Sequence, residues 1–144
     1  MKTYFETSVL VAAVVEGHPH HGPAWRAWEH ATGRGRQAFI SAHGMAEFYA
    51  VLTRTPFTPR VYPGEAWRIL EATVLPCAKV IALTASEYRR TMQTCAEEGW
   101  TGGVVYDALH LQCARKAACS RIYTFNLRDF QSLAPDLKDQ ICAP

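Results

Sequence analysis

TGGVVYDALHLQCARKAACSRIYTFNLRDF, from Thr101 to Phe130, is the stretch that decides the fold. After its two glycines it predicts a helix built from good helix formers, apolar around most of its circumference, with one acid at Asp107. A short strand, IYT, follows, and then a polar turn that holds Asn126 and Asp129. The pattern therefore brings a helix and the end of a strand to one place.

Asp107 has two interpretations from this stretch alone. A buried carboxylate is costly without a partner, so hydrogen bonds or a cation must compensate it. Near the amino end of a helix the macrodipole also favours negative charge, and in that case Asp107 only stabilises its own helix. The other acids of the chain have to decide between these interpretations.

The composition fits one globular domain, residues 1–144. Of the 144 residues, 49% are hydrophobic, which is enough to form the core of one domain. The formal net charge of +2 neither indicates nor excludes an anionic partner. The five cysteines form no C-x-x-C pair, which is typical of reduced thiols in a cytoplasmic protein. The apolar run Val9–Val15 is too short to span a membrane, so we expect no membrane segment and no export signal.

Strand-like segments alternate with helices along the chain. Besides IYT, these segments are Lys2–Phe5, Gln37–Ile40 and AKVIAL at residues 78–83, with a short edge strand expected near Ile141. Such alternation predicts an α/β fold in which helices cover both faces of a parallel sheet. Later in the chain, Thr84 and Glu87 form a capping box that opens a helix.

A second isolated acid, Glu47, lies in the predicted helix AHGMAEFYAVLTR, residues 42–54. The apolar side chains of this helix have core spacing, and Glu47 falls outside their stripe. Arg54, seven residues later, returns to nearly the same side of the helix. Glu47 can therefore be an ordinary exposed acid with a neighbouring arginine.

The acids of the chain are predicted to gather at one edge of the sheet. Glu6 follows the first strand, and Asn126 and Asp129 follow the IYT strand, at the edge where α/β sheets bind ligands. Asp107 lies near a helix start beside that edge, and Glu47 can join if its helix packs across it. Carboxylates without His or Cys form a hard-oxygen site, which selects Mg²⁺ or Mn²⁺ over zinc. Such cations serve phosphodiester hydrolysis.

Other motifs lack the context that their function needs. His18, His20 and His21 surround a proline in a loop, where histidines are more often solvated than bound to a metal. The segment 33–38 matches G-x-G-x-x-A, but it follows a helix and precedes a strand, the reverse of a dinucleotide site. A phosphatase or nucleotide-binding protein is disfavoured because the chain has neither D-x-D nor a P-loop.

FETSVLVA, AEFYAVL, VVYDALHLQCA and TFNLRDF, in this order, resemble the four acidic motifs of the PIN-domain ribonucleases, particularly the VapC toxins of bacterial toxin–antitoxin pairs. The resemblance covers essentially the whole chain. It implies a single PIN-like domain with a parallel sheet of about five strands and Mg²⁺-dependent endoribonuclease activity, with Mn²⁺ as an alternative ion. It also implies an RNA substrate, a homodimer and a small antitoxin protein that covers the site.

The resemblance assigns roles by position in the motifs. The residues expected to act in catalysis hold the acidic positions: Glu6, Glu47, Asp107 and Asp129. The residues expected to bind the metal offer oxygen at the sheet edge: Glu6, Asp107, Asp129 and Asn126. The residues expected to contact the substrate carry a hydroxyl or guanidinium group beside the acids: Thr7, Ser8, Arg54 and Arg128. Thr7 or Ser8 is also expected to cap the helix after the first strand.

Glu6 departs from the family pattern, which has Asp at this position. The extra methylene moves the carboxylate by about one C–C bond length, and Mg²⁺ tolerates distorted octahedral geometry poorly. Asn126 likewise offers a neutral amide oxygen. The alternative to an active nuclease is therefore a catalytically weakened PIN-fold module that binds RNA or a protein partner without cutting.

Overall fold

Five parallel strands form the centre of the computed structural model, which describes all 144 residues. Their order across the sheet is β3-β2-β1-β4-β5. Their bounds are β1 Lys2–Phe5, β2 Gln37–Ser41, β3 Ala78–Ile81, β4 Arg121–Tyr123 and β5 Ile141–Cys142. The predicted α/β class and the short edge strand at Ile141 are confirmed.

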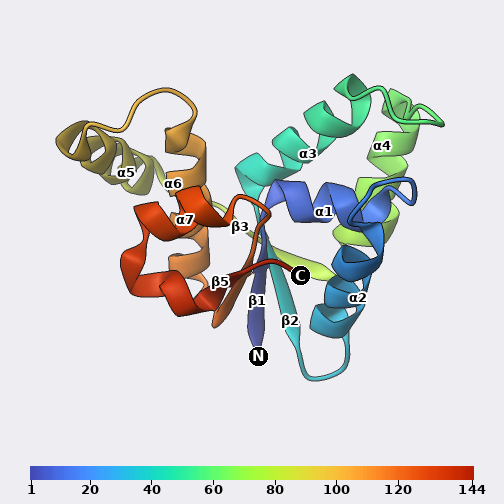
Figure 1. Cartoon of the computed structure of the whole chain (residues 1–144), viewed down its shortest axis with the longest axis horizontal. Coiled ribbons are helices and arrows are strands. Elements are labelled where there is room, and N and C mark those ends of the chain that lie inside the picture. The colour runs from blue at the N-terminus through green and yellow to red at the C-terminus, as the bar shows by residue number, and fades with distance from the viewer.

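Helices cover both faces of this sheet (Figure 1). One group consists of α1 Thr7–Val14, α2 His21–Thr32, α3 Ala42–Arg54 and α4 Pro63–Ile69, which continues as a π-helical turn, Leu70–Val74. The other group consists of α5 Ala85–Glu98, α6 Val104–Lys116 and α7 Leu127–Leu133, followed by a 3₁₀ turn, Pro135–Gln140. The capping box of Thr84 and Glu87 opens α5 as predicted.

Alternate strand side chains supply two separate cores, because successive residues of a strand point to opposite faces. Phe5 and Ile40 pack with the α1–α4 group. Tyr4 and Phe39 pack on the other face with α6 and α7, where Phe130 is completely buried. Burying one such aromatic side chain contributes about 1.5–3 kcal/mol. The two cores together fix the sheet between its helical layers.

The central strand β1 is the point where the strand order reverses. Tyr4 pairs with Phe39 of β2 on one side and with Ile122 of β4 on the other. Ligands of open α/β sheets bind beside such a point, outside the carboxyl ends of the strands. Glu6 follows β1 directly, so the topology places it at this crevice.

The segment after β4 differs from the sequence prediction. We expected a polar turn around Asn126 and Asp129, but Leu127–Leu133 forms α7. Its apolar residues recur with helical spacing, and Phe130 anchors the helix in the core beside α6. Asp129 therefore lies on the first turn of a helix, and Asn126 stands at the position just before it.

The helices and the cysteines of the fold give two further findings. No helix combines the length and the apolar character that crossing a bilayer requires. All five cysteines are free thiols. Burial raises the pKa of Cys113 and of Cys119 to about 12, so both are protonated and unreactive near neutral pH.

Candidate active site

Glu6 is buried at the junction of β1 and α1, with 8% of its surface exposed. Its carboxylate caps α1: Oε1 accepts a hydrogen bond from the backbone N–H of Ser8 at 3.0 Å, and Oε2 accepts one from the Ser8 hydroxyl. Capping by Thr7 or Ser8 was expected, and this is wrong. The longer glutamate chain can fold back over the first turn, which satisfies an orphan N–H of the helix.

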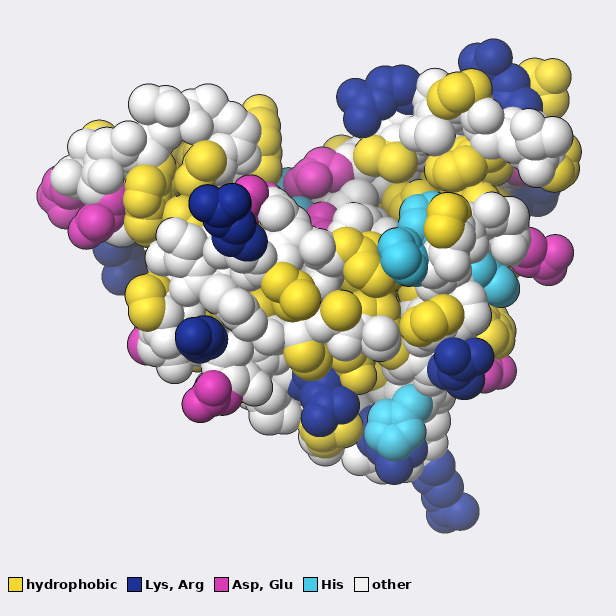
Figure 2. Space-filling model, viewed as in Figure 1, with side chains coloured by type: hydrophobic (Ala, Val, Ile, Leu, Met, Phe, Trp, Pro, Cys, Tyr) yellow, Lys and Arg dark blue, Asp and Glu magenta, His cyan; other side chains and the backbone are white.

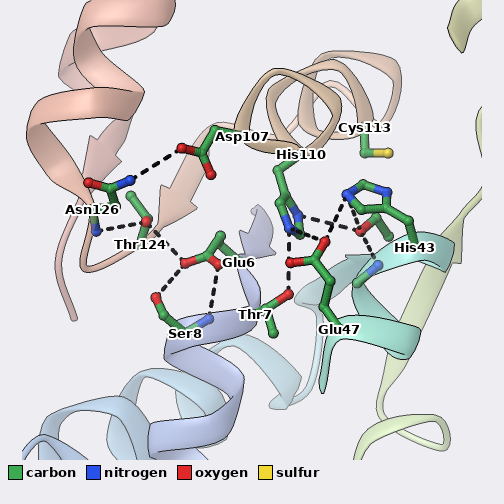
Figure 3. A network of polar contacts seen from close by, with 12 residues as sticks. Glu6, Thr7, Ser8, His43, Glu47, Asp107, His110, Cys113, Thr124 and Asn126 are labelled. Atoms are coloured by element: carbon green, nitrogen blue, oxygen red, sulfur yellow. Dashed lines mark hydrogen bonds and ion pairs between the residues drawn. The ribbon is translucent and has the colours of Figure 1, made fainter. Parts of the chain in front are cut away.

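Thr124 and Asn126 connect Glu6 to Asp107 across the sheet edge (Figure 3). The Thr124 hydroxyl donates to Oε2 of Glu6 at 3.1 Å, and it accepts from the backbone N–H of Asn126 at 3.0 Å. The side-chain amide of Asn126 donates in turn to Oδ2 of Asp107 at 3.2 Å. Residues that follow β1 and β4 are thus joined with a residue of α6 in one network.

Asp107 carries the largest resolved pKa shift among the acids of this edge. Burial, followed by the charge of Glu6, raises the pKa of Asp107 to about 6, and the charges of Asp129 and Glu47 add to the rise while His110 opposes it. Burial and the neighbouring negative charges together therefore outweigh the effect of His110, which lowers this pKa. An acid that serves only its own helix would not have such neighbours.

No lysine or arginine neutralises this group of acids. The Lys and Arg ion pairs of the protein, Arg115 with Asp136 and Lys116 with Glu87, involve other acids. Arg54 and Arg128 are exposed and form no ion pair, so Arg54 does not neutralise Glu47 through one. Asp129 is exposed, yet its charge acts on Asp107. The edge has a deficit of positive charge.

Glu47 turns toward two histidines instead. Its Oε1 lies 3.2 Å from Nε2 of His110 on α6 and 3.5 Å from Nε2 of His43, one turn earlier on α3. Burial raises the pKa of Glu47, but the contacts with the two imidazoles outweigh it and hold that pKa below its usual range. Burial lowers the pKa of His43 to about 4. The prediction of an acidic site without histidine is therefore wrong around Glu47.

His110 was missed by the sequence analysis. It follows Asp107 by three residues, so both side chains share one side of α6, and this spacing was the available signal. His110 is 1% exposed, and its Nδ1 lies 2.7 Å from the Tyr4 hydroxyl. Gly44 permits this packing, because a Cβ there would lie 2.6 Å from the Ser41 hydroxyl and 3.3 Å from the His110 ring.

A cavity of about 520 Å³ opens beside these groups. Its polar floor includes Glu6, Thr7, Ser8 and Glu47, and its walls carry aromatic rings: His18, His20, Phe57 and Phe125. Acidic side chains lie at the base of the hollow between the two helical groups, as Figure 2 shows. His21 bonds the backbone oxygen of Ala12, so the three loop histidines do not converge on one point.

Comparisons with known proteins agree with this geometry. A family model described as PIN domain matches residues 3–134. Ribonuclease VapC40 of Mycobacterium tuberculosis is 36% identical over 123 residues, 85% of this chain and 85% of that protein. Ribonuclease VapC27 of the same organism is 34% identical over 104 residues, 72% and 70% of the two chains. The crystal structure of M. tuberculosis VapC20, titled a sarcin-ricin loop cleaving toxin, has a TM-score of 0.72 and 19% identity, covering 90% of this chain and 94% of that one.

Proposed function

Because this chain belongs to the PIN-domain family, we propose that it is a divalent-metal-dependent endoribonuclease and the toxin of a toxin–antitoxin pair. The observation that carries the proposal is the deficit of positive charge at the carboxyl edge of the sheet. Glu6, Asp107 and Asp129 share this edge with no lysine or arginine in an ion pair with any of them. A hydrated cation would offset the negative charges that, together with burial, raise the pKa of Asp107.

The donors at this edge fit Mg²⁺. Carboxylates of Glu6, Asp107 and Asp129 and the amide oxygen of Asn126 are hard oxygen ligands, which Mg²⁺ and Mn²⁺ prefer. The Asn126 amide directs its N–H toward Asp107, which leaves its carbonyl oxygen free for a cation. When bound, Mg²⁺ would supply positive charge to the scissile phosphate and would acidify an attacking water.

The protein's own residues prepare the site for that ion. Thr124 and Ser8 hold the Glu6 carboxylate in one orientation, and Asn126 does the same for Asp107. Asp107 must be deprotonated to serve as a ligand, and with a pKa of about 6 it loses its proton just below neutral pH. Such outer hydrogen bonds position ligands and strengthen metal binding.

The RNA would approach from the cavity side. The hydroxyls of Thr7 and Ser8 line this cavity beside Glu6. The exposed guanidinium groups of Arg54 and Arg128 have no acidic partner, so each is available for a phosphate or for the acidic tail of an antitoxin. We assign phosphate binding to both arginines.

We assign the remaining partners on the same basis. A small antitoxin would cover the cavity, and a second copy of the chain would bury exposed aromatic surface such as Tyr62 and Trp67, which are 63% and 52% exposed. Free thiols and an RNA substrate are typical of cytoplasmic proteins, so we assign the protein to the cytoplasm. Sedimentation of the purified chain at several concentrations tests the homodimer.

One observation favours the alternative of a binding module that does not cut. Both oxygens of Glu6 already accept hydrogen bonds, from Ser8 and from Thr124, and the capping position draws the carboxylate toward α1. Cleavage of single-stranded RNA by antitoxin-free protein, with Mg²⁺, with Mn²⁺ and with a chelator, separates the two functions. Metal-dependent cleavage supports the enzyme, whereas RNA binding without cleavage in every condition supports the module.

A further inference from the structure

His43, Glu47 and His110 form a compact group at the far end of the acidic network (Figure 3). His43 and Glu47 are four residues apart on α3, so their side chains lie on one face of the helix. His110 reaches them from α6, and its ring centroid lies 4.4 Å from that of His43. One donor atom from each residue lies within 4.8 Å of the other two.

The spacing of these donor atoms suits a tetrahedral metal ion. Zn²⁺ binds imidazole nitrogen and carboxylate oxygen at about 2.0–2.2 Å, which separates two ligand atoms by roughly 3.3–3.5 Å in a tetrahedron. Oε1 of Glu47 lies 3.2 Å from Nε2 of His110 and 3.5 Å from Nε2 of His43. Two of the three ligand-to-ligand distances therefore already match a tetrahedral ion, and the two nitrogens lie within 4.8 Å of each other.

Tyr4 of β1 orients the His110 ring so that its second nitrogen can bind a metal. The Tyr4 hydroxyl contacts Nδ1 of His110 at 2.7 Å, and this directs Nε2 toward Glu47. Metal-binding histidines commonly use the second ring nitrogen in this way. Ser41 contacts both imidazoles, at 3.4 and 3.5 Å, and so limits the rotation of the two rings.

Glu47 contains a buried oxygen that lacks a hydrogen-bond donor. Its Oε1 is shielded from solvent, and neither neighbouring ring N–H is in line with it despite the short distances. Such an oxygen has lost its hydration without gaining a hydrogen bond, which is unfavourable. A cation between this oxygen and the two imidazole nitrogens would satisfy it.

We propose that His43, Glu47 and His110 bind a borderline transition-metal ion, with Zn²⁺ the best match. Two imidazoles and one carboxylate select Zn²⁺ over Mg²⁺, whereas the all-oxygen group of Glu6, Asp107, Asp129 and Asn126 has the opposite preference. Glu47 also lines the cavity, and a water molecule from that side would complete the tetrahedron as the fourth ligand. The inference goes beyond the proposed nuclease function, and no RNA is needed to test it.

Zn²⁺ titration of the metal-free full-length chain by calorimetry tests the site. We expect one strong site per chain that a large excess of Mg²⁺ does not displace. His43→Ala, a change at the partly exposed member, should weaken binding at least about 100-fold, because even outer partners of metal ligands contribute about 10–100-fold. His30→Ala, at an exposed position on α2, is the control and should leave the affinity unchanged. Wild-type affinity in His43→Ala, displacement by Mg²⁺, or loss of binding in His30→Ala would overturn the proposal.

Cobalt(II) in place of zinc identifies the ligands independently. We expect visible d–d bands of a tetrahedral ion in the wild type, and we expect their loss in Glu47→Gln, which keeps the shape of the side chain but removes its charge. Tyr4→Phe should keep the bands and weaken binding about 10–100-fold, since it frees the His110 ring without removing a ligand. Near-ultraviolet thiolate bands, which would indicate a cysteine site, or intact bands in Glu47→Gln would overturn the assignment.

Discussion

Asn126 donates a side-chain hydrogen bond to Oδ2 of Asp107 at 3.2 Å, and this bond joins the end of β4 to α6. The two residues are 19 positions apart in the sequence. Parallel strand order brings them together, because β4 lies beside β1 and its carboxyl end opens on the same crevice. The bond orients two of the oxygen donors assigned to the metal.

Asn126→Ala should weaken Mg²⁺ binding and slow RNA cleavage about 10- to 100-fold at limiting Mg²⁺, because Asp107 loses its orienting partner and the ion loses a donor. The measurement is cleavage rate across a Mg²⁺ titration. Gln131→Ala is a matched control, since this amide on α7 bonds Ile141 instead. An Asn126→Ala protein with the Mg²⁺ dependence of the wild type would contradict the assignment.

The contribution of Asp107 to stability without divalent metal should fall as the pH rises from about 4 to about 7, whereas His43, whose pKa is lowered to about 4, contributes in the opposite direction. The pKa of Asp107 is about 6 in the folded protein and 3.8 for an ordinary aspartate, as in the unfolded chain. Between these pH values the folded state therefore binds more protons at Asp107 than the unfolded state does. The loss should be on the order of 1 kcal/mol, because partial exposure screens the charge. Urea unfolding with a chelator, at several pH values, measures it.

Two comparisons isolate Asp107 in that experiment. Asp107→Asn should lack this contribution, because the amide does not titrate, so the stability of the wild type relative to Asp107→Asn should decrease as the pH rises. Mg²⁺ added at neutral pH should restore stability to the wild type alone. If the free energy of unfolding depended on pH equally in wild type and Asp107→Asn, the pKa of Asp107 would not be raised by burial and neighbouring charge.

Glu6→Asp should speed cleavage about three- to tenfold and tighten Mg²⁺ binding. Aspartate is also a good N-cap, so α1 should keep its start while the shorter carboxylate moves toward the geometry of the family pattern. The measurement is RNA cleavage by both forms across a Mg²⁺ titration, with circular dichroism as the control for folding. A slower Glu6→Asp protein with intact structure would mean that the remaining ligands are built for glutamate.

Arg128→Ala and Arg54→Ala should each weaken RNA binding and lower the slope of log affinity against log salt by about 0.7. Binding of single-stranded RNA is measured in the Asp107→Asn background, which prevents cleavage. Arg34→Ala is the control, because Arg34 is exposed in the turn before β2, at the opposite edge of the sheet. If the salt slopes of Arg128→Ala and Arg54→Ala equalled that of Arg34→Ala, neither arginine would bind a phosphate of the RNA.

The sequence was sufficient for the architecture because its signals are local. Strand segments such as Lys2–Phe5, the capping box at Thr84 and the buried pattern of α6 each specify an element, and the alternation of elements specifies a parallel sheet. The position of Glu6 after a central strand follows from the same reasoning. These features require no knowledge of side-chain packing.

The errors concern the direction in which side chains point and the surfaces on which they pack. Glu47 lies against histidines of α3 and α6, and nothing near Glu47 in the sequence identifies His110 as its neighbour. The capping role of Glu6 depends on how a flexible side chain turns, and local preference for Thr7 or Ser8 did not reveal it. Helix α7 depends on the core that receives Phe130.

The most direct test of the nuclease assignment compares wild type with Asp107→Asn in Mg²⁺-dependent cleavage of RNA. The substitution removes a charge with almost no change in shape, so the fold should persist while activity falls by at least about 100-fold, a loss of about 2.7 kcal/mol in transition-state stabilisation. Cleavage by folded, antitoxin-free Asp107→Asn at the wild-type rate would contradict a metal site at this edge.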